Sequence, residues 1–364
     1  MNAIRQSFVI RNWMIFLLLA VCGLFYVKWF PYYQRALNAA ATHSIGQSIL
    51  LGAEARSPEP SLAAALDYAW RYGRAIWQAM VLGLLLGSAV QVLLPARWIV
   101  RVLGHTGFGS VAAGGLLAIP GMMCTCCAAP VVAGLREQKA SPGGALAFWL
   151  GNTMLNPATL VFMAFVLGWH WAVLRLVLGA LMVFGLGALA NRLSRLSRPA
   201  VLDGALAAPL AAPLAGQIAQ IEAHAAGLAG HVFVRWMGLC ARMTWRLVPE
   251  YLVLILLLGA SRAWLFPHFG PEVTNHLGWI LGLAVAGMLF VIPTAGEVPI
   301  VQAMLSLGMS VGPAAALLLT LPPVSVPSLV MLARSFAPGL LLLVASAVVG
   351  FGLIAAGLAI VLGF

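Results

Sequence analysis

Three cysteines within four positions, Cys124, Cys126 and Cys127, are the residues of this chain best suited to chemistry. They lie between two prolines in the stretch PGMMCTCCAAP, with Met123 directly before them. Thiolate and thioether sulfur favour soft ions such as copper(I), mercury and trivalent arsenic or antimony, so the cluster predicts a soft-metal or metalloid site. The CxxC pair could instead be a redox couple, and membrane cysteines could also be simple packing residues.

Glu297 is the second residue whose position predicts chemistry. Of nine Asp and Glu residues, it alone lies deep within an apolar run, LFVIPTAGEVPIV. An ionisable group in the bilayer interior costs at least ~2.5 kcal/mol, which favours a proton or substrate site. The alternative is a buried carboxyl group that only satisfies backbone groups freed by neighbouring prolines. We interpret Glu297 as a proton-coupling residue that faces the cysteines across one cavity.

Polar side chains and prolines interrupt the apolar runs elsewhere. Proline removes a helix hydrogen bond, and hydrocarbon tolerates the exposed carbonyl groups only where protein or a polar cavity satisfies them. The polar side chains could line a path or only satisfy the backbone near the prolines. The predicted substrate-binding set adds Asn152, Asn156, Thr294 and Ser325 to the sulfur residues. The predicted helix breaks are Pro120, Pro130, Pro157, Pro293, Pro299 and Pro327.

Composition defines the elements that must position these residues. The 364 residues are 62% hydrophobic and only 8% charged, which excludes an ordinary soluble protein. The apolar runs are continuous and lack the alternation of a barrel, so we predict an all-α polytopic membrane protein with the lipid bilayer as partner. The formal charge of +11 comes from basic residues scattered beside apolar runs, so nucleic acid is excluded as a partner.

An internal repeat organises the chain. LLLGSAVQVLLP, residues 84–95, recurs as LLLGASRAWLFP, residues 256–267, and the proline-rich landmarks follow in the same order. Each repeat is predicted to hold four helices: a long one, two that are broken by prolines, and a last long one. Such breaks at equivalent places indicate the central site of a transporter. The predicted segments are an extra N-terminal transmembrane helix with its connection (1–64), a first repeat (65–191), a basic Ala/Pro/Gly-rich linker (192–237) and a second repeat (238–364).

Basic residues predict the orientation. Those around the linker indicate that this face is cytoplasmic, by the positive-inside rule. Arg97 and Arg101 fit a simple count of crossings poorly. Whether the repeats are parallel or inverted stays open, because one broken helix per unit could be re-entrant. The basic residues around the linker are Arg192, Arg195, Arg198, Arg235, Arg242 and Arg246.

The chain resembles the predicted permeases that include the organoarsenical efflux permeases. The resemblance covers roughly residues 70–364 and rests on CTCCAAP after Ile-Pro, GGALAFWLGNTMLNPATL, IPTAGEVPIV and PPVSVP. It implies an eight-helix or similar inner-membrane permease that exports trivalent organoarsenicals. It also implicates Cys124, Cys126 and Cys127, with Glu297 as their counterpart. The chain has CTCC where the family leads us to expect two cysteines one residue apart and then glycine, so the cargo stays open.

These observations predict a multi-pass permease of the bacterial inner membrane. It would export a soft, thiol-reactive metal or metalloid, driven by protons, without enzymatic activity or a cofactor. The sequence has no GxxxxGK[ST] motif, so energy must come from a gradient or a partner. The alternatives are a membrane thiol-disulfide redox protein and a permease for another small solute.

Overall fold

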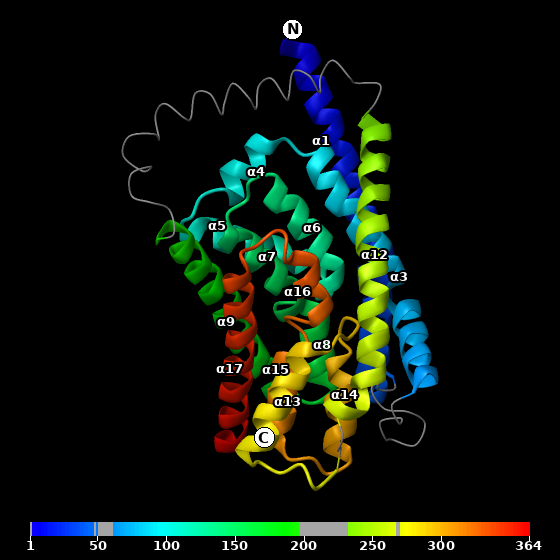
Figure 1. The fold of residues 1–364 in the computed structure, drawn as a ribbon, viewed down its shortest axis with the longest axis vertical. Coiled ribbons are helices and arrows are strands. Elements are labelled where there is room, and N and C mark those ends of the chain that lie inside the picture. Colours follow the sequence, from blue (N-terminus) through cyan, green and yellow to red (C-terminus); the bar gives the residue numbers. More distant parts are fainter. Residues whose placement is uncertain (1, 47–48, 50–60, 197–231, 267–269) are drawn as a thin grey trace.

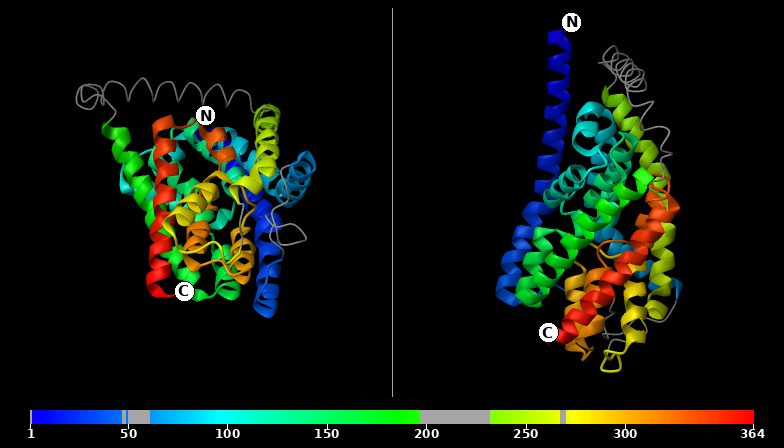
Figure 2. Two further views of the ribbon diagram at one scale, coloured as in Figure 1. Left: turned by 60° about the horizontal axis from the view of Figure 1, so that its bottom comes forward. Right: turned by 90° about the vertical axis from the view of Figure 1, so that its left-hand side faces the viewer.

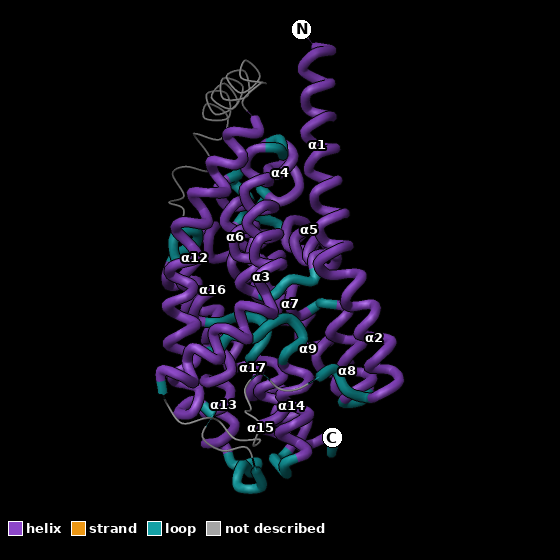
Figure 3. Tube along the Cα trace, turned by 90° about the vertical axis from the view of Figure 1, so that its right-hand side faces the viewer, coloured by secondary structure: helices purple, strands orange, loops and turns teal. Residues whose placement is uncertain are grey.

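The structure of the protein is a computed structural model that describes residues 2–46, 49, 61–196, 232–266 and 270–364 (Figure 1). The described residues form helices joined by loops. No strand occurs in these ranges, and loop segments cross the middle of the helix bundle (Figure 3). Within them, five helices are long and apolar enough to cross a membrane, or six if one bent pair is a single span. The predicted all-α polytopic class is therefore confirmed. Most of the predicted linker lies outside the described residues.

The N-terminal span runs along one side of the bundle and projects beyond it (Figure 2). Its apolar part, Ile10–Thr42, is continuous but contains one widened turn, where Pro31 cannot donate a hydrogen bond to the preceding turn. Lys28 lies in this turn. The span consists of α1 (Asn2–Leu24), the π-helical turn η1 (Phe25–Trp29) and α2 (Phe30–Thr42).

Two long helices, α3 (Leu62–Val92) and α12 (Val232–Leu265), pack against each other in opposite directions. The indole Nε1 of Trp236, near the start of α12, donates to Ser88 Oγ, near the end of α3, at 3.0 Å. Further along α12, Tyr251 hydrogen-bonds to Tyr72 at 2.8 Å between the hydroxyl oxygens. Contacts further along α12 therefore involve residues closer to the start of α3, so the two helices are antiparallel.

The segment after α3 enters the bundle and turns back. Ser110 Oγ, near the start of the inward arm (Phe108–Ala118), lies 3.1 Å from Ser141 Oγ, just after the end of the returning arm (Thr125–Glu137), so the outer ends of the two arms lie together. The turn between the two arms holds Pro120 and Gly121. This re-entrant hairpin consists of α4 (Ala96–Leu103), α5 (Phe108–Ala118), the short turn η2 (Ile119–Gly121) and α6 (Thr125–Glu137).

The next three helices form a broken span and its antiparallel neighbour. Near the start of the broken span, Gly143 N donates to Asn191 Oδ1 at 2.8 Å, whereas Thr153, near the break, contacts Arg175. The break is capped by Asn156, which begins the second piece. The helices are α7 (Pro142–Met154), α8 (Pro157–Val166) and α9 (Trp169–Leu196).

The helices after α12 form a second re-entrant hairpin and a second broken span. Gly312 N, after the hairpin, donates to Asn275 Oδ1, before it, at 3.0 Å. Because α3 and α12 are antiparallel, the two hairpins enter from opposite ends. The ring of Phe364 at the chain end lies 5.2 Å from Trp171 at the start of α9, so α17 and α9 are antiparallel. The helices are α13 (Leu277–Leu289), α14 (Glu297–Ser306), α15 (Val311–Thr320), α16 (Val326–Leu332) and α17 (Pro338–Leu362).

One predicted helix break, Pro130, is wrong. Pro130 lies inside α6, and Pro299 lies in the first turn of α14. A first-turn proline needs no intrahelical donor, so Pro299 fits a helix start. Pro130 only removes one bond from a helix that continues on both sides. The other four lie in η2, before α14, or in the first turns of α8 and α16, namely Pro120, Pro293, Pro157 and Pro327.

The hairpin also accounts for the two arginines that fit the simple count poorly. Arg97 and Arg101 lie on α4, before the chain enters the bundle along α5. Asn191 Nδ2, near the end of α9, donates to Gly107 O, just after α4, at 3.3 Å. The α4 arginines therefore lie at the same end of the molecule as Arg192.

Candidate functional site

The turn of the first hairpin brings two of the three clustered cysteines together. Cys124 is the N-cap residue of α6 and Cys127 lies in its first turn, so their i, i+3 spacing places them on one face. Their Sγ atoms lie 3.0 Å apart, and both are free, buried thiols. Gly83 of α3 lies against the backbone of Cys127, where a larger residue would push α6 away. The pair is thus held at the positive end of the α6 helix dipole.

Cys126 points elsewhere. Its Sγ lies 3.8 Å from the hydroxyl oxygen of Ser325, at the break before α16. Ser325 caps α16 through a reciprocal capping box with Ser328. No three His, Cys, Asp or Glu side chains within the described ranges are placed to hold one metal ion. The structure therefore presents two converging sulfur atoms, and the third contacts the second broken span.

The predicted amides support the backbone. Asn152 Oδ1 accepts from Met123 N at 3.4 Å, and Asn152 Nδ2 donates to Phe148 O at 2.8 Å. Asn152 thus braces the turn that precedes the cysteines. Asn156 caps α8 by accepting from the backbone N of Ala158 at 3.1 Å. Neither amide, and not Met123, belongs to the linings of the two cavities that adjoin Cys124.

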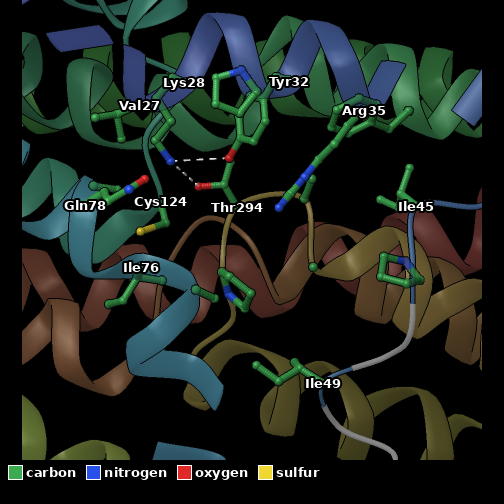
Figure 4. A pocket seen from close by; sticks show the side chains of 18 residues that line it. Val27, Lys28, Tyr32, Arg35, Ile45, Ile49, Ile76, Gln78, Cys124 and Thr294 are labelled. Atoms are coloured by element: carbon green, nitrogen blue, oxygen red, sulfur yellow. Dashed lines mark hydrogen bonds between the residues drawn. The ribbon is translucent and has the colours of Figure 1, made fainter. Parts of the chain in front are cut away.

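The larger cavity, of about 220 Å³, lies between the N-terminal span, α3 and the turn of the second hairpin (Figure 4). Cys124 and Thr294 line it together with Lys28, Tyr32 and Arg35. Lys28 Nζ donates to Thr294 Oγ1 at 3.1 Å and to Tyr32 Oη at 3.3 Å. The predicted Thr294 therefore lies at a cavity wall, opposite a buried lysine that is only 5% exposed.

A second cavity, of about 10 Å³, adjoins both the predicted carboxyl group and one of the three cysteines. Its lining includes both Cys124 and Glu297. Glu297 Oε1 accepts from Arg175 Nη1 at 2.5 Å, and neither side chain is more than 2% exposed. Arg175 Nη2 also donates to Thr153 O at 2.7 Å, at the end of α7. The carboxyl group is thus held in a buried ion pair that links α14, α9 and the first broken span.

Sequence reasoning missed Lys28, Arg35 and Arg175. A signal existed for Arg175, because it is the only charged residue of α9 before Arg192 and carries the same membrane cost as a lone glutamate. Lys28 follows the apolar run from Trp13 and resembles an ordinary charged flank. Only the packing of the N-terminal span shows that it faces a cavity.

A bundle of apolar helices with two re-entrant hairpins and buried ionisable groups at the hairpin turns defines a multi-pass membrane permease. The chain matches the family described as "Predicted permease", ArsP_1, over residues 8–150 and 76–361, and it belongs to that family. It is 48% identical over 346 residues to the UPF0718 protein YraQ of Escherichia coli (strain K12), covering 95% of this chain and 94% of that protein. No solved structure matches the chain. The family match extends to residue 8, so the apolar part of the N-terminal span, Ile10–Thr42, falls within it.

Proposed function

We propose that this permease exports a soft, thiol-reactive metal or metalloid species, such as a trivalent organoarsenical, across the bacterial inner membrane. The observation that carries the proposal is the pair of Cys124 and Cys127 thiols, 3.0 Å apart at the hairpin turn, with Cys124 on the walls of two cavities. Paired sulfur ligands at an irregular turn suit a soft ion. Cys126 serves the contact to Ser325.

Capture proceeds by ligand exchange in the proposed mechanism. A trivalent organoarsenical carries two exchangeable hydroxyl groups. The thiols of Cys124 and Cys127 replace them and form two As–S bonds, and each thiol proton leaves with one hydroxyl group as water. The arsenic keeps its oxidation state, so release needs only the reverse exchange with water or another thiol.

Glu297 couples release to protons in this account. Protonation of the carboxylate removes the charge that holds Arg175, so the contact between α14, α9 and Thr153 can open beside Cys124. Transport by Glu297→Gln should then become independent of pH. Retained pH dependence in that variant would exclude this role.

The two hairpins support an arrangement of two inverted repeats. The order of long helix, re-entrant hairpin, broken span and long helix occurs from α3 to α9 and again from α12 to α17. The corresponding long helices are antiparallel, and the hairpins enter from opposite ends. We place the α4 end of the molecule on the cytoplasmic side because of its arginines. Inverted repeats around a central site permit alternating access.

Single serine substitutions test the proposal in cells that lack their own arsenical exporters. Cys124→Ser and Cys127→Ser should abolish tolerance to methylarsenite, antimonite, copper or mercury, whichever the wild type confers. Cys126→Ser is the matched control and should retain it, because its sulfur points away from the pair. If tolerance to all four were the same with and without the three thiols, the proposal would be refuted.

The 3.0 Å separation of the Cys124 and Cys127 sulfurs also favours a second function, thiol-disulfide exchange. In that reaction a partner protein's disulfide is reduced to two thiols while this pair becomes a disulfide. Loss of the pair would then abolish reduction of the partner and leave metalloid tolerance unchanged. A permease for another small solute would show neither effect.

A further inference from the structure

We propose that the cavity of about 220 Å³ beside Cys124 binds a small anion, and that the cargo of this permease carries a negative charge next to its soft atom. The second part rests on the proposed function, because it takes the cavity to be the cargo site. The first part is independent of it. Both follow from the charges that surround the cavity.

Within the described residues, no Asp or Glu side chain pairs with the ammonium group of Lys28. It is 5% exposed, and its hydrogen bonds go to the neutral hydroxyl groups of Tyr32 and Thr294. An ammonium group has three N–H donors, so one remains for a ligand. No Asp or Glu is found in the lining of this cavity within the described ranges. Burying an unpaired charge is costly, which favours a ligand that neutralises it.

Three further positive contributions face the same cavity. Arg35 lies two helical turns after Lys28, on the same face of the N-terminal span, and its side chain reaches the lining (Figure 4). The other two are the N-termini of α6 and α14, whose cap residues Cys124 and Gly296 also belong to the lining. Backbone N–H groups at helix starts attract anions, and broken helices in transporters use them for anionic substrate groups.

The acidic residue that lines the smaller cavity beside Cys124 does not neutralise this charge. Glu297 begins α14, but its carboxylate is held by Arg175 at 2.5 Å and lines the smaller cavity. The Glu297–Arg175 pair is neutral as a unit. The positive charge of Lys28 and Arg35 therefore remains for a ligand.

The position of Cys124 specifies the ligand further. Its thiol lines the same cavity as Lys28, so one small molecule can touch both groups. The class that fits is a small anion that carries a thiol-reactive soft atom, with its anionic group at Lys28 and Arg35 and its soft atom at Cys124.

Two arsenical probes that differ in charge test this inference. One is 4-carboxyphenylarsine oxide, which carries a carboxylate, and the other is neutral phenylarsine oxide. Dissociation constants are measured with purified protein in lipid nanodiscs for the wild type, Lys28→Met and Lys28→Arg. A charge-assisted hydrogen bond corresponds to about a 10- to 100-fold change in affinity. Lys28→Met should weaken the carboxylated probe by this factor and leave the neutral probe within about threefold, whereas Lys28→Arg should retain most of the affinity.

An equal effect of Lys28→Met on both probes, or no effect on either, overturns the inference. Arg71→Met is the matched control, because it removes a positive charge from an exposed pair with Asp67 and should change neither constant. If Lys28→Met does not fold, Arg35→Gln replaces it and must still weaken the carboxylated probe more than the neutral one. Cys124→Ser separates the two proposals: if it weakens neither probe, thiol capture fails, while the Lys28 comparison still decides the anion site.

Discussion

The buried ion pair between Arg175 and Glu297 predicts that single and double substitutions have opposite consequences. Arg175→Met or Glu297→Met leaves the other charge buried without its partner. Such a break costs about 3–5 kcal/mol, whereas replacing both members of a buried pair by apolar residues is often close to neutral. Each single variant should therefore shift the unfolding equilibrium by roughly two to four orders of magnitude, and the double variant should recover most of that loss.

The assay is the free energy of unfolding of the purified protein in mixed micelles, followed by circular dichroism as sodium dodecyl sulfate is added. Arg71→Ala supplies the matched control, because it breaks the exposed pair with Asp67, whose atoms lie 2.9 Å apart. An exposed pair contributes only about 0.2–1 kcal/mol. If the double variant lost as much unfolding free energy as the two single variants together, the two side chains would not stabilise each other.

Three smaller predictions concern the hairpin turn and the first broken span. Gly83→Ala should cost about 1–3 kcal/mol of unfolding free energy, because the added Cβ would meet the Cys127 backbone. Gly73→Ala on the same helix has open space around it and should cost nothing. Equal losses in the two variants would contradict this packing. Asn156→Ala should cost about 0.5–2 kcal/mol by the same unfolding assay, because α8 loses its cap, and an unchanged value would argue against the cap. Diamide should oxidise Cys124 and Cys127 to an internal disulfide, seen by mass spectrometry of peptides, and unreacted thiols would contradict their 3.0 Å contact.

Much of the architecture could be predicted from the sequence because a membrane restricts the choices. Continuous apolar runs with few charges leave only helices. Prolines in the sequence also located several helix boundaries, such as the one at Pro157, where α8 begins. The predicted break at Pro130 was wrong, because one missing hydrogen bond does not end a helix whose neighbours pack on both sides.

The candidate site could be predicted only in part. The cysteine cluster is visible in the sequence, but which two sulfurs converge depends on where α6 begins. Because Cys124 caps the helix, Cys127 shares its face and Cys126 does not. The partners Lys28 and Arg175 come from helices distant in the chain. Their contacts depend on tertiary packing, which no local pattern encodes.

In the proposed mechanism Cys124 and Cys127, without Cys126, bind the soft atom of the cargo. Arsenic K-edge X-ray absorption of the purified protein loaded with methylarsenite measures the sulfur atoms bound to arsenic directly. We expect two As–S bonds in the wild type and in Cys126→Ser, and a loss of this coordination in Cys124→Ser and in Cys127→Ser. Arsenic bound by three sulfurs, or by none, in the wild-type protein would contradict binding by this pair.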